Sequence, residues 1–165
     1  MRANTSIYEE VPVSTIEESI DVQVPVSTAY NQWTQFETFP QFMGGVQEVR
    51  QLDDQRLYWV AEVAGQKREW EAKITEQNPD ERIAWTSTGG ALHAGVVTFH
   101  RIDDDQSRVM LQMEFEPEDF KEKAADALGL VKSRVKGDLK KFKGFIEKRD
   151  SETGEWRGEV QQDRV

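Results

Sequence analysis

The feature that most constrains this chain is a series of short strand-like segments with no room for helices between them. Turn sequences such as Asn78-Pro79-Asp80 separate six such segments between residues 46 and 116. Parallel strands need a crossover of a dozen or more residues, so a parallel Rossmann-type sheet is excluded and antiparallel hairpins are predicted. The strands are expected at about 46–52, 56–63, 67–77, 81–88, 95–102 and 107–116.

Other elements flank this series on both sides. Alternation over 20–24 predicts a half-buried strand that Pro25 stops, and the aromatic residues that follow predict two short helices. Residues 118–149 repeat apolar side chains every three or four positions, which is typical of one long helix with a buried face. The glycines of this helix predict close packing on the sheet or a kink near Gly129. Together these elements predict an α+β domain with its helices on one face of an antiparallel sheet of about seven strands.

Length and composition limit the number of domains. At 165 residues the chain fits one domain, which we place at residues 16–149. Residues 1–15 and 150–165 are polar, rich in Glu and without sustained periodicity. We therefore expect both segments to be loose tails.

Charge and composition exclude several classes of function. A net charge of −10 argues against a general nucleic-acid binder, which needs a basic surface. The absence of Cys excludes disulfides, zinc–thiolate sites, iron–sulfur clusters and cysteine nucleophiles. His93, expected in a loop, and His100, expected on the outer side of a strand, have no carboxylates at ligand spacing. We expect no metal and no cofactor.

The sequence contains no signal for export or membrane insertion. The first 18 residues lack the apolar run of a signal peptide, and nowhere do about 18 apolar residues follow one another. We expect a soluble, cytoplasmic protein.

The predicted inner face of the sheet is apolar and rich in aromatic residues. One helix about 10 Å wide cannot cover seven strands that span roughly 30 Å, so the rest of this face either is filled by the short helices or lines a cavity. A solid aromatic core and a ligand-binding cavity both fit this pattern. The candidate cavity residues are Phe36, Phe39, Phe42, Met43, Trp59, Trp70, Trp85, Phe99, Met113 and Phe115, with Leu128 and Val131 from the long helix.

Four segments resemble one known family. Residues 24–33 (VPVSTAYNQW), 36–43 (FETFPQFM), 45–49 (GVQEV) and 79–85 (PDERIAW) are similar to the polyketide cyclase/dehydrase and lipid-transport family, in the coenzyme-Q-binding branch of the START-like (SRPBCC) superfamily. The resemblance implies a helix-grip fold, in which a curved antiparallel sheet wraps a long C-terminal helix around a hydrophobic cavity. Members of this family bind lipids, isoprenoid quinones, plant hormones or polyketides, and a minority are aromatase/cyclases.

The aromatase/cyclases use polar residues in the cavity, including an Arg. The position that matches this Arg falls near Thr75, on the polar side of its strand, and Arg68 lies close to it in the sequence. Acid–base chemistry needs a titratable group inside the cavity, and the nearby candidates Glu62, Tyr58 and Arg101 are all predicted to face outward. We therefore name no catalytic residue and leave enzymatic activity open.

Three functions fit these observations. The first is a binding or carrier protein for a hydrophobic small molecule such as a polyketide, an isoprenoid quinone or a lipid. The second is a polyketide aromatase/cyclase-like enzyme, and the third is an interaction module with a filled core.

The long helix carries a second signal. Between residues 130 and 149 there are eight basic and two acidic residues, a net charge of +6, so the rest of the chain carries −16. A basic amphipathic helix can contact anionic lipid head groups, and a solvated face that balances an acidic sheet is the alternative. The candidate contacts are Lys132, Lys136, Lys140, Lys141 and Lys143.

Overall fold

The computed structural model describes residues 14–63, 65–89, 93–115 and 120–161, with the backbone alone described for residues 14, 63, 115 and 120–128. The N-terminal tail expected over residues 1–15 therefore lies almost wholly outside the described residues. No helix among the described residues is long and apolar enough to cross a membrane.

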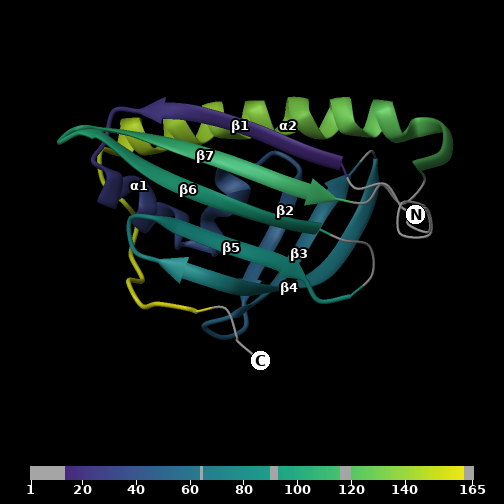
Figure 1. Ribbon diagram of the computed structural model, residues 1–165, viewed down its shortest axis with the longest axis horizontal. Helices are drawn as coiled ribbons and strands as arrows, with labels where there is room; N and C mark the ends of the chain where they lie inside the picture. The colour runs from purple at the N-terminus through teal and green to yellow at the C-terminus, as the bar shows by residue number, and fades with distance from the viewer. Residues whose placement is uncertain (1–13, 64, 90–92, 116–119, 162–165) are drawn as a thin grey trace, which may run out of the picture.

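Seven antiparallel strands form one sheet in the order β1-β7-β6-β5-β4-β3-β2 (Figure 1). Consecutive strands from β2 to β7 pair as hairpins, as the short turns predict, and the first strand pairs with the last. The strands are β1 Ser14–Val22, β2 Val46–Gln51, β3 Arg56–Val63, β4 Gln66–Asn78, β5 Arg82–Ser87, β6 His93–Asp103 and β7 Gln106–Phe115.

Local irregularities accompany the curvature of the sheet around the long helix. The pairing register shifts in β2, in β4 between Ile74 and Glu76, and near the end of β6. A bulge places two residues opposite one and bends its strand. In β4 the shift also brings Gln77 to the inner face, where it lies opposite Ile83 and is only 1% exposed. Simple alternation places Gln77 on the outer side.

Three helical segments complete the fold: α1 Val26–Trp33, the 3₁₀ helix η2 Phe36–Gln41 and α2 Phe120–Arg149. The predicted helix-grip arrangement is confirmed, because α2 lies along the concave side of the sheet (Figure 1). Its buried stripe consists of Val135, Leu139, Phe142 and Ile146, all exposed by 5% or less. Truncating a core Phe such as Phe142 to Ala typically costs about 3–5 kcal/mol.

The glycines of α2 do not serve the close packing on the sheet that the sequence suggested as one alternative. A Cβ atom at Gly129, Gly137 or Gly144 meets nothing within 4 Å, so none of the three permits a close approach to the sheet. The helix is one continuous element through Gly129, and a kink there stays a prediction.

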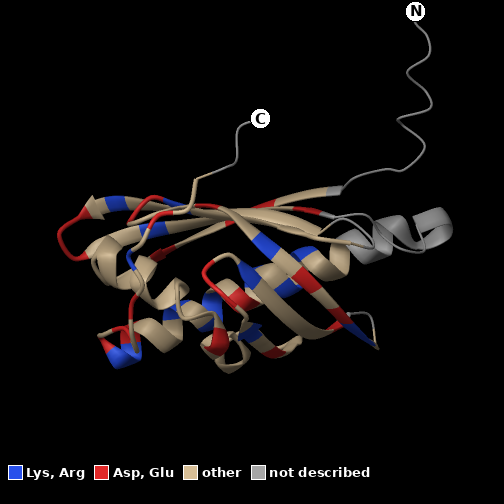
Figure 2. Ribbon diagram, turned by 90° about the horizontal axis from the view of Figure 1, so that it is seen from below, with Lys and Arg blue, Asp and Glu red and all other residues tan. Residues whose placement is uncertain are grey.

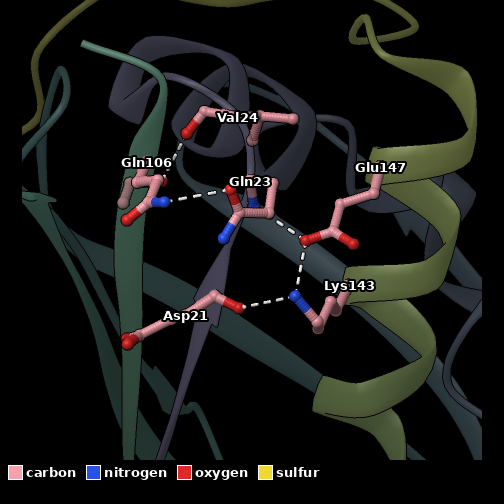
Figure 3. A network of polar contacts seen from close by, with 7 residues as sticks. Asp21, Gln23, Val24, Gln106, Lys143 and Glu147 are labelled. Carbon is pink, nitrogen blue, oxygen red and sulfur yellow. Dashed lines mark hydrogen bonds and ion pairs between the residues drawn. The ribbon is translucent and has the colours of Figure 1, made fainter. Parts of the chain in front are cut away.

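A polar network fastens the C-terminal half of α2 to the end of β1 (Figure 3). The Gln23 N–H donates to Glu147 Oε2 at 2.7 Å, and Lys143 Nζ donates to the same oxygen at 2.6 Å. Lys143 Nζ also donates to the Asp21 carbonyl at 3.1 Å, while Gln106 Nε2 donates to Gln23 Oε1 at 3.0 Å. These bonds fix the helix at the end opposite to residues 120–131.

The segment 150–161, which we name the C-terminal strap, packs on the domain instead of forming the expected loose tail. Val160 is 4% exposed and pairs with Gln77 through two backbone hydrogen bonds of 2.8 and 2.9 Å. The Arg157 guanidinium lies 2.8 Å from Asp80 Oδ2 and over the Tyr30 ring. Further hydrogen bonds join Glu152 to Asn31, Thr153 to Gln32 and the Trp156 N–H to Thr34 Oγ1. Polar side chains of α1 and of the residues just after it therefore hold a segment that has no apolar periodicity.

Candidate functional site

The inner face of the sheet has one end filled by aromatic residues. Trp33 lies edge-on to Phe142 with ring centroids 5.0 Å apart, and Phe42 contacts Phe142 at 5.2 Å. Phe36 and Phe39 contact each other at 5.4 Å. All five rings are exposed by 3% or less. The structure therefore places Phe36, Phe39 and Phe42, three of the candidate cavity residues, in a closely packed cluster.

The other end of the inner face, which we name the open end, is where β3 meets β4, β5 meets β6, and β7 finishes (right side of Figure 1). Trp70, Trp85 and Met113 point to the inner face here, as parity predicts, and Val131 of α2 also packs at the margin of the buried core. All four side chains are only half-buried. Solvent therefore reaches apolar side chains on the inner face at this end.

Three rings form a continuous stack across the open end. Trp59 and Trp70 are directly opposite in the β3–β4 pair, and their rings lie within 2° of parallel with centroids 5.9 Å apart. The ring of His93 continues the stack on Trp70 at 5.1 Å and 15°. The Trp59 Nε1 atom is buried without a hydrogen-bond partner. A buried donor of this kind is ordinarily paired by water or by a ligand.

His93 is a residue that sequence reasoning placed wrongly. It was expected in a loop, but it is the first residue of β6 and pairs with the end of β7. Its N–H donates to Ser87 Oγ at 3.1 Å. The signal for an inward His93 was the alternation of His93, Gly95, Val97 and Phe99, which share one face of the strand.

Gly95 makes room for Trp85. The two residues are directly opposite in the β5–β6 pair, and a Cβ atom on Gly95 falls only 2.6 Å from Trp85 Cζ2. Real Cβ atoms do not approach so closely. The absent side chain therefore lets the Trp85 ring lie across β6 at the open end.

A few polar groups also belong to the inner face. Arg68 lies opposite the buried Ala61 and shares the parity of Trp70, whereas Thr75 lies within the β4 register shift. The Glu18 side chain is 14% exposed, and its Oε2 lies 4.0 Å from Lys132 Nζ of α2. These groups border an otherwise apolar surface.

The polar candidates predicted to face outward do so. Tyr58 hydrogen-bonds Glu69 on the exposed face of the sheet, and Arg101 pairs with Asp104 in the β6–β7 turn. Glu62 is exposed.

The remaining candidate residues have different surroundings. Phe99 is 5% exposed and packs edge-on against Tyr30 at 5.3 Å, and Met43 is half-buried after η2. The side chains of Phe115 and Leu128 lie outside the described residues. Within the described parts of the chain, no three His, Asp or Glu residues gather in a way that could hold a metal ion.

Comparisons with known proteins agree with this architecture. The chain is 61% identical over 149 residues to a protein of Streptomyces lincolnensis described as an uncharacterized 17.2 kDa protein in the melC2–rnhH intergenic region, and the match covers 90% of this chain and 99% of that protein. A START superfamily protein from Mycobacterium smegmatis is similar with a TM-score of 0.70 and 12% identity, over 82% of this chain and 98% of that one. The ZhuI aromatase/cyclase from Streptomyces sp. R1128 has a TM-score of 0.70 and 14% identity, over 88% of this chain and 100% of that one.

The structural likenesses, at such low identity, show the fold alone. The match to a family model is broader evidence, because it extends over residues 22–143 and so includes α1, η2, the strands β2 to β7 and most of α2. That model describes the polyketide cyclase/dehydrase and lipid-transport family, and this chain belongs to that family.

Proposed function

We propose that the protein binds or carries a hydrophobic small molecule at the open end of its inner face. The observation that supports this most strongly is the half-burial of Trp70 and Trp85 on the concave side of the sheet. At the filled end, by contrast, the Trp33 ring is 2% exposed. Large aromatic side chains left partly solvated in a concavity are typical of small-molecule sites.

The proposed ligand class is a polyketide, an isoprenoid quinone (the class bound in the coenzyme-Q-binding branch) or a lipid. All three carry enough apolar surface to gain from contact with Trp70, Trp85 and Met113, at about 25 cal/mol for each Å² removed from water. We place this binding in the cytoplasm, since a chain without Cys suits a reducing compartment.

Aromatase/cyclase-like activity is the second candidate function. Its supporting observation is that Arg68 and His93 share the inner side of the open end with the aromatic stack. Turnover of a poly-β-ketone that is lost in both Arg68→Gln and His93→Gln, with ligand binding retained, favours an enzyme. Binding without turnover in the unsubstituted protein favours a carrier.

Mass spectrometry of protein purified gently from its own host tests the carrier directly. A stoichiometric hydrophobic adduct, identified after organic extraction, supports a carrier and reports the class of its ligand. An apo mass together with no binding of an apolar fluorescent probe contradicts the proposal and favours an interaction module with a filled core.

Two substitutions locate the binding site. We expect Trp70→Ala and Trp85→Ala to weaken binding of an apolar fluorescent probe by about 10-fold each, because each removes about 2 kcal/mol of aromatic contact. Trp156→Ala is the matched control, since Trp156 belongs to the C-terminal strap. Equal probe binding in all three variants contradicts the assignment to the open end.

We extend the proposal to a transient contact between α2 and anionic membranes during loading or release of the ligand. The positive charge for this contact lies in residues 130–149, and Figure 2 shows basic residues at several points along the described part of α2.

A further inference from the structure

The exposed face of α2 differs in composition from the rest of the molecule. At 3.6 residues per turn, the positions opposite the buried stripe of Val135, Leu139, Phe142 and Ile146 form one continuous surface. We name this surface the basic face. It consists of Leu130, Ser133, Arg134, Lys136, Gly137, Lys140, Lys141, Gly144 and Lys148.

The basic face contains five cations, namely Arg134, Lys136, Lys140, Lys141 and Lys148. The two acidic residues of this half of the helix are already engaged: Asp138 accepts a hydrogen bond from the Gly44 N–H, and Glu147 accepts hydrogen bonds from Lys143 and the Gln23 N–H. The chain outside residues 130–149 carries a net charge of −16. Residues 130–149 of α2 therefore carry a net positive charge in a chain whose remainder is strongly acidic.

The structure also changes which basic residues belong to this face. Lys132 lies close to Glu18 of β1, and Lys143 is bound to Glu147 and to the Asp21 carbonyl. These two of the five expected lysines therefore contact the sheet side of α2 and do not belong to the basic face. Lys148 takes their place by helical position, whereas Arg134 and Lys141 lie at the edge of the face, where their side chains reach Gly45 and Gly44.

The glycines of the basic face are unexplained by packing within the chain. Each costs about 1 kcal/mol of helix stability relative to Ala, yet a Cβ atom at Gly137 or Gly144 meets nothing within 4 Å. These two glycines flank Lys140 in sequence. Because they have no side chains, the helix backbone is uncovered between the lysines. Such a surface allows a flat partner to approach the helix backbone closely.

Two partners can lie flat against a helix surface with little side-chain cover: a second copy of α2 and a lipid bilayer. Their charges decide between them. A second copy of α2 brings five cations against five, which is repulsive. An anionic bilayer attracts each Lys or Arg near its surface by about 1 kcal/mol. The apolar part of the face also suits a bilayer surface, because Leu130 is 60% exposed.

The position of the basic face connects it to the ligand site. Leu130 and Val131 belong to the half of α2 that lies at the same end of the molecule as the open end (right side of Figure 1). Contact between the helix and a membrane at Leu130 therefore brings the lipid surface beside the partly solvated aromatic residues.

We propose that the basic face of α2 is a docking surface for anionic bilayers, in which the cations contact lipid head groups and Leu130 enters the interface. The proposal rests on the proposed carrier function, to which it adds the surface where a membrane-derived ligand is exchanged. With one exposed apolar anchor, binding is mainly electrostatic, reversible and weakened by salt.

The test is co-sedimentation of the full chain with vesicles of phosphatidylcholine containing about 30% phosphatidylglycerol, at low ionic strength where surface electrostatics are strongest. We expect binding to these vesicles, none to pure phosphatidylcholine vesicles, and release at about 0.5 M NaCl. The triple variant Lys136→Glu, Lys140→Glu and Lys148→Glu should reduce the apparent affinity at least 10-fold. The matched control, Arg50→Glu, Lys67→Glu and Arg101→Glu, makes the same change in net charge on the sheet and should stay within about twofold of the unsubstituted protein.

Three results overturn the proposal: no vesicle binding by the unsubstituted protein, an equal loss in both triple variants, or a dimer whose formation depends on the same lysines. An apolar-probe titration of the Lys136, Lys140 and Lys148 variant separates the two proposals. Normal probe binding without vesicle binding supports docking through the basic face and leaves the carrier function intact. Vesicle binding without any probe binding removes the carrier function alone.

Discussion

Gly95 and Trp85 show how one residue shapes the surface of the open end. The Trp85 ring occupies the space that a side chain on Gly95 needs. Glycine is unfavourable inside a strand by roughly 0.5–1 kcal/mol relative to Ala, so its presence in β6 has a local cost that the position of the ring explains.

We expect Gly95→Ala to lower the free energy of unfolding by about 1–3 kcal/mol, because the new Cβ forces the Trp85 ring out of its place. Chemical denaturation measures this change, and binding of an apolar probe should weaken in parallel. Gly89→Ala serves as the control, since a Cβ there meets nothing within 4 Å. A Gly95→Ala protein as stable as the control contradicts the assigned role.

Asp138 is a residue whose charge opposes folding. Burial raises the pKa of its carboxyl, against the opposing effects of the Gly44 N–H and of the neighbouring Arg134 and Lys141. A carboxyl whose pKa is higher in the folded than in the unfolded state favours folding when protonated, and this advantage is lost as the pH rises through the folded-state pKa.

Asp138→Asn should therefore raise the melting temperature at pH 7, since the amide keeps an oxygen acceptor for the Gly44 N–H without the buried charge. The difference from the unsubstituted protein should shrink as the pH falls and vanish below about pH 4, where both side chains are neutral. Thermal melts across this range measure it. A variant that is less stable at pH 7 shows that attraction to Arg134 and Lys141 outweighs burial.

At the scale of elements, the C-terminal strap is an addition to the part of the chain that matches the family. The family match ends at residue 143, whereas the strap covers α1 and the β4–β5 turn with residues 150–161. Asp80 in that turn has φ of 64°, a left-handed conformation that non-glycine residues seldom adopt. Glycine adopts this conformation with less strain, but only Asp supplies the carboxylate that pairs with Arg157. This ion pair explains why the position is occupied by Asp.

Ending the chain after Asp150 should lower the free energy of unfolding by about 2–4 kcal/mol, because several hydrogen bonds and the burial of Val160 are lost together. Thermal or denaturant unfolding measures the loss. A chain that ends after Gln161 is the control and should match the full protein. Equal stability of the two shortened chains identifies the strap as a loose tail after all.

The sequence predicted the elements better than it predicted the exceptions to their patterns. Strand ends were predicted within about two residues for most of the sheet because turn residues such as Asn78-Pro79-Asp80 act locally. The β4 register shift was not predictable, since it depends on pairing with β5, and it moved Gln77 inside. The strap was missed because its contacts are polar and reach residues about 120 positions away.

In the candidate site, too, the local pattern predicted some features, and others depended on tertiary packing. Parity correctly placed Trp59, Trp70 and Trp85 on the inner face. It could not distinguish a filled end from an open one, because that difference depends on how α1 and η2 pack against Phe142. Which of the predicted residues contact a ligand stays a prediction.

At the scale of the whole molecule, charge is divided between two surfaces. The outer face of the sheet mixes both signs in pairs such as Arg108 with Asp21 and Lys67 with Glu69. Exposed pairs of this kind contribute about 0–1 kcal/mol each and cancel each other's field at a distance. The chain outside residues 130–149 still carries a net charge of −16, so approach to an anionic surface is favoured only in the orientation that presents α2.

The pairing of β1 with β7 has a consequence for how a newly made chain folds. About 80 residues separate these two strands, so a ribosome needs roughly 4–16 s to deliver β7 after β1 has emerged. During that interval the inner edge of β1 has no partner, and α2, which covers the concavity, has not yet been synthesised. Yield in a foreign host should consequently depend on translation speed and chaperone supply as well as on the stability of the finished protein.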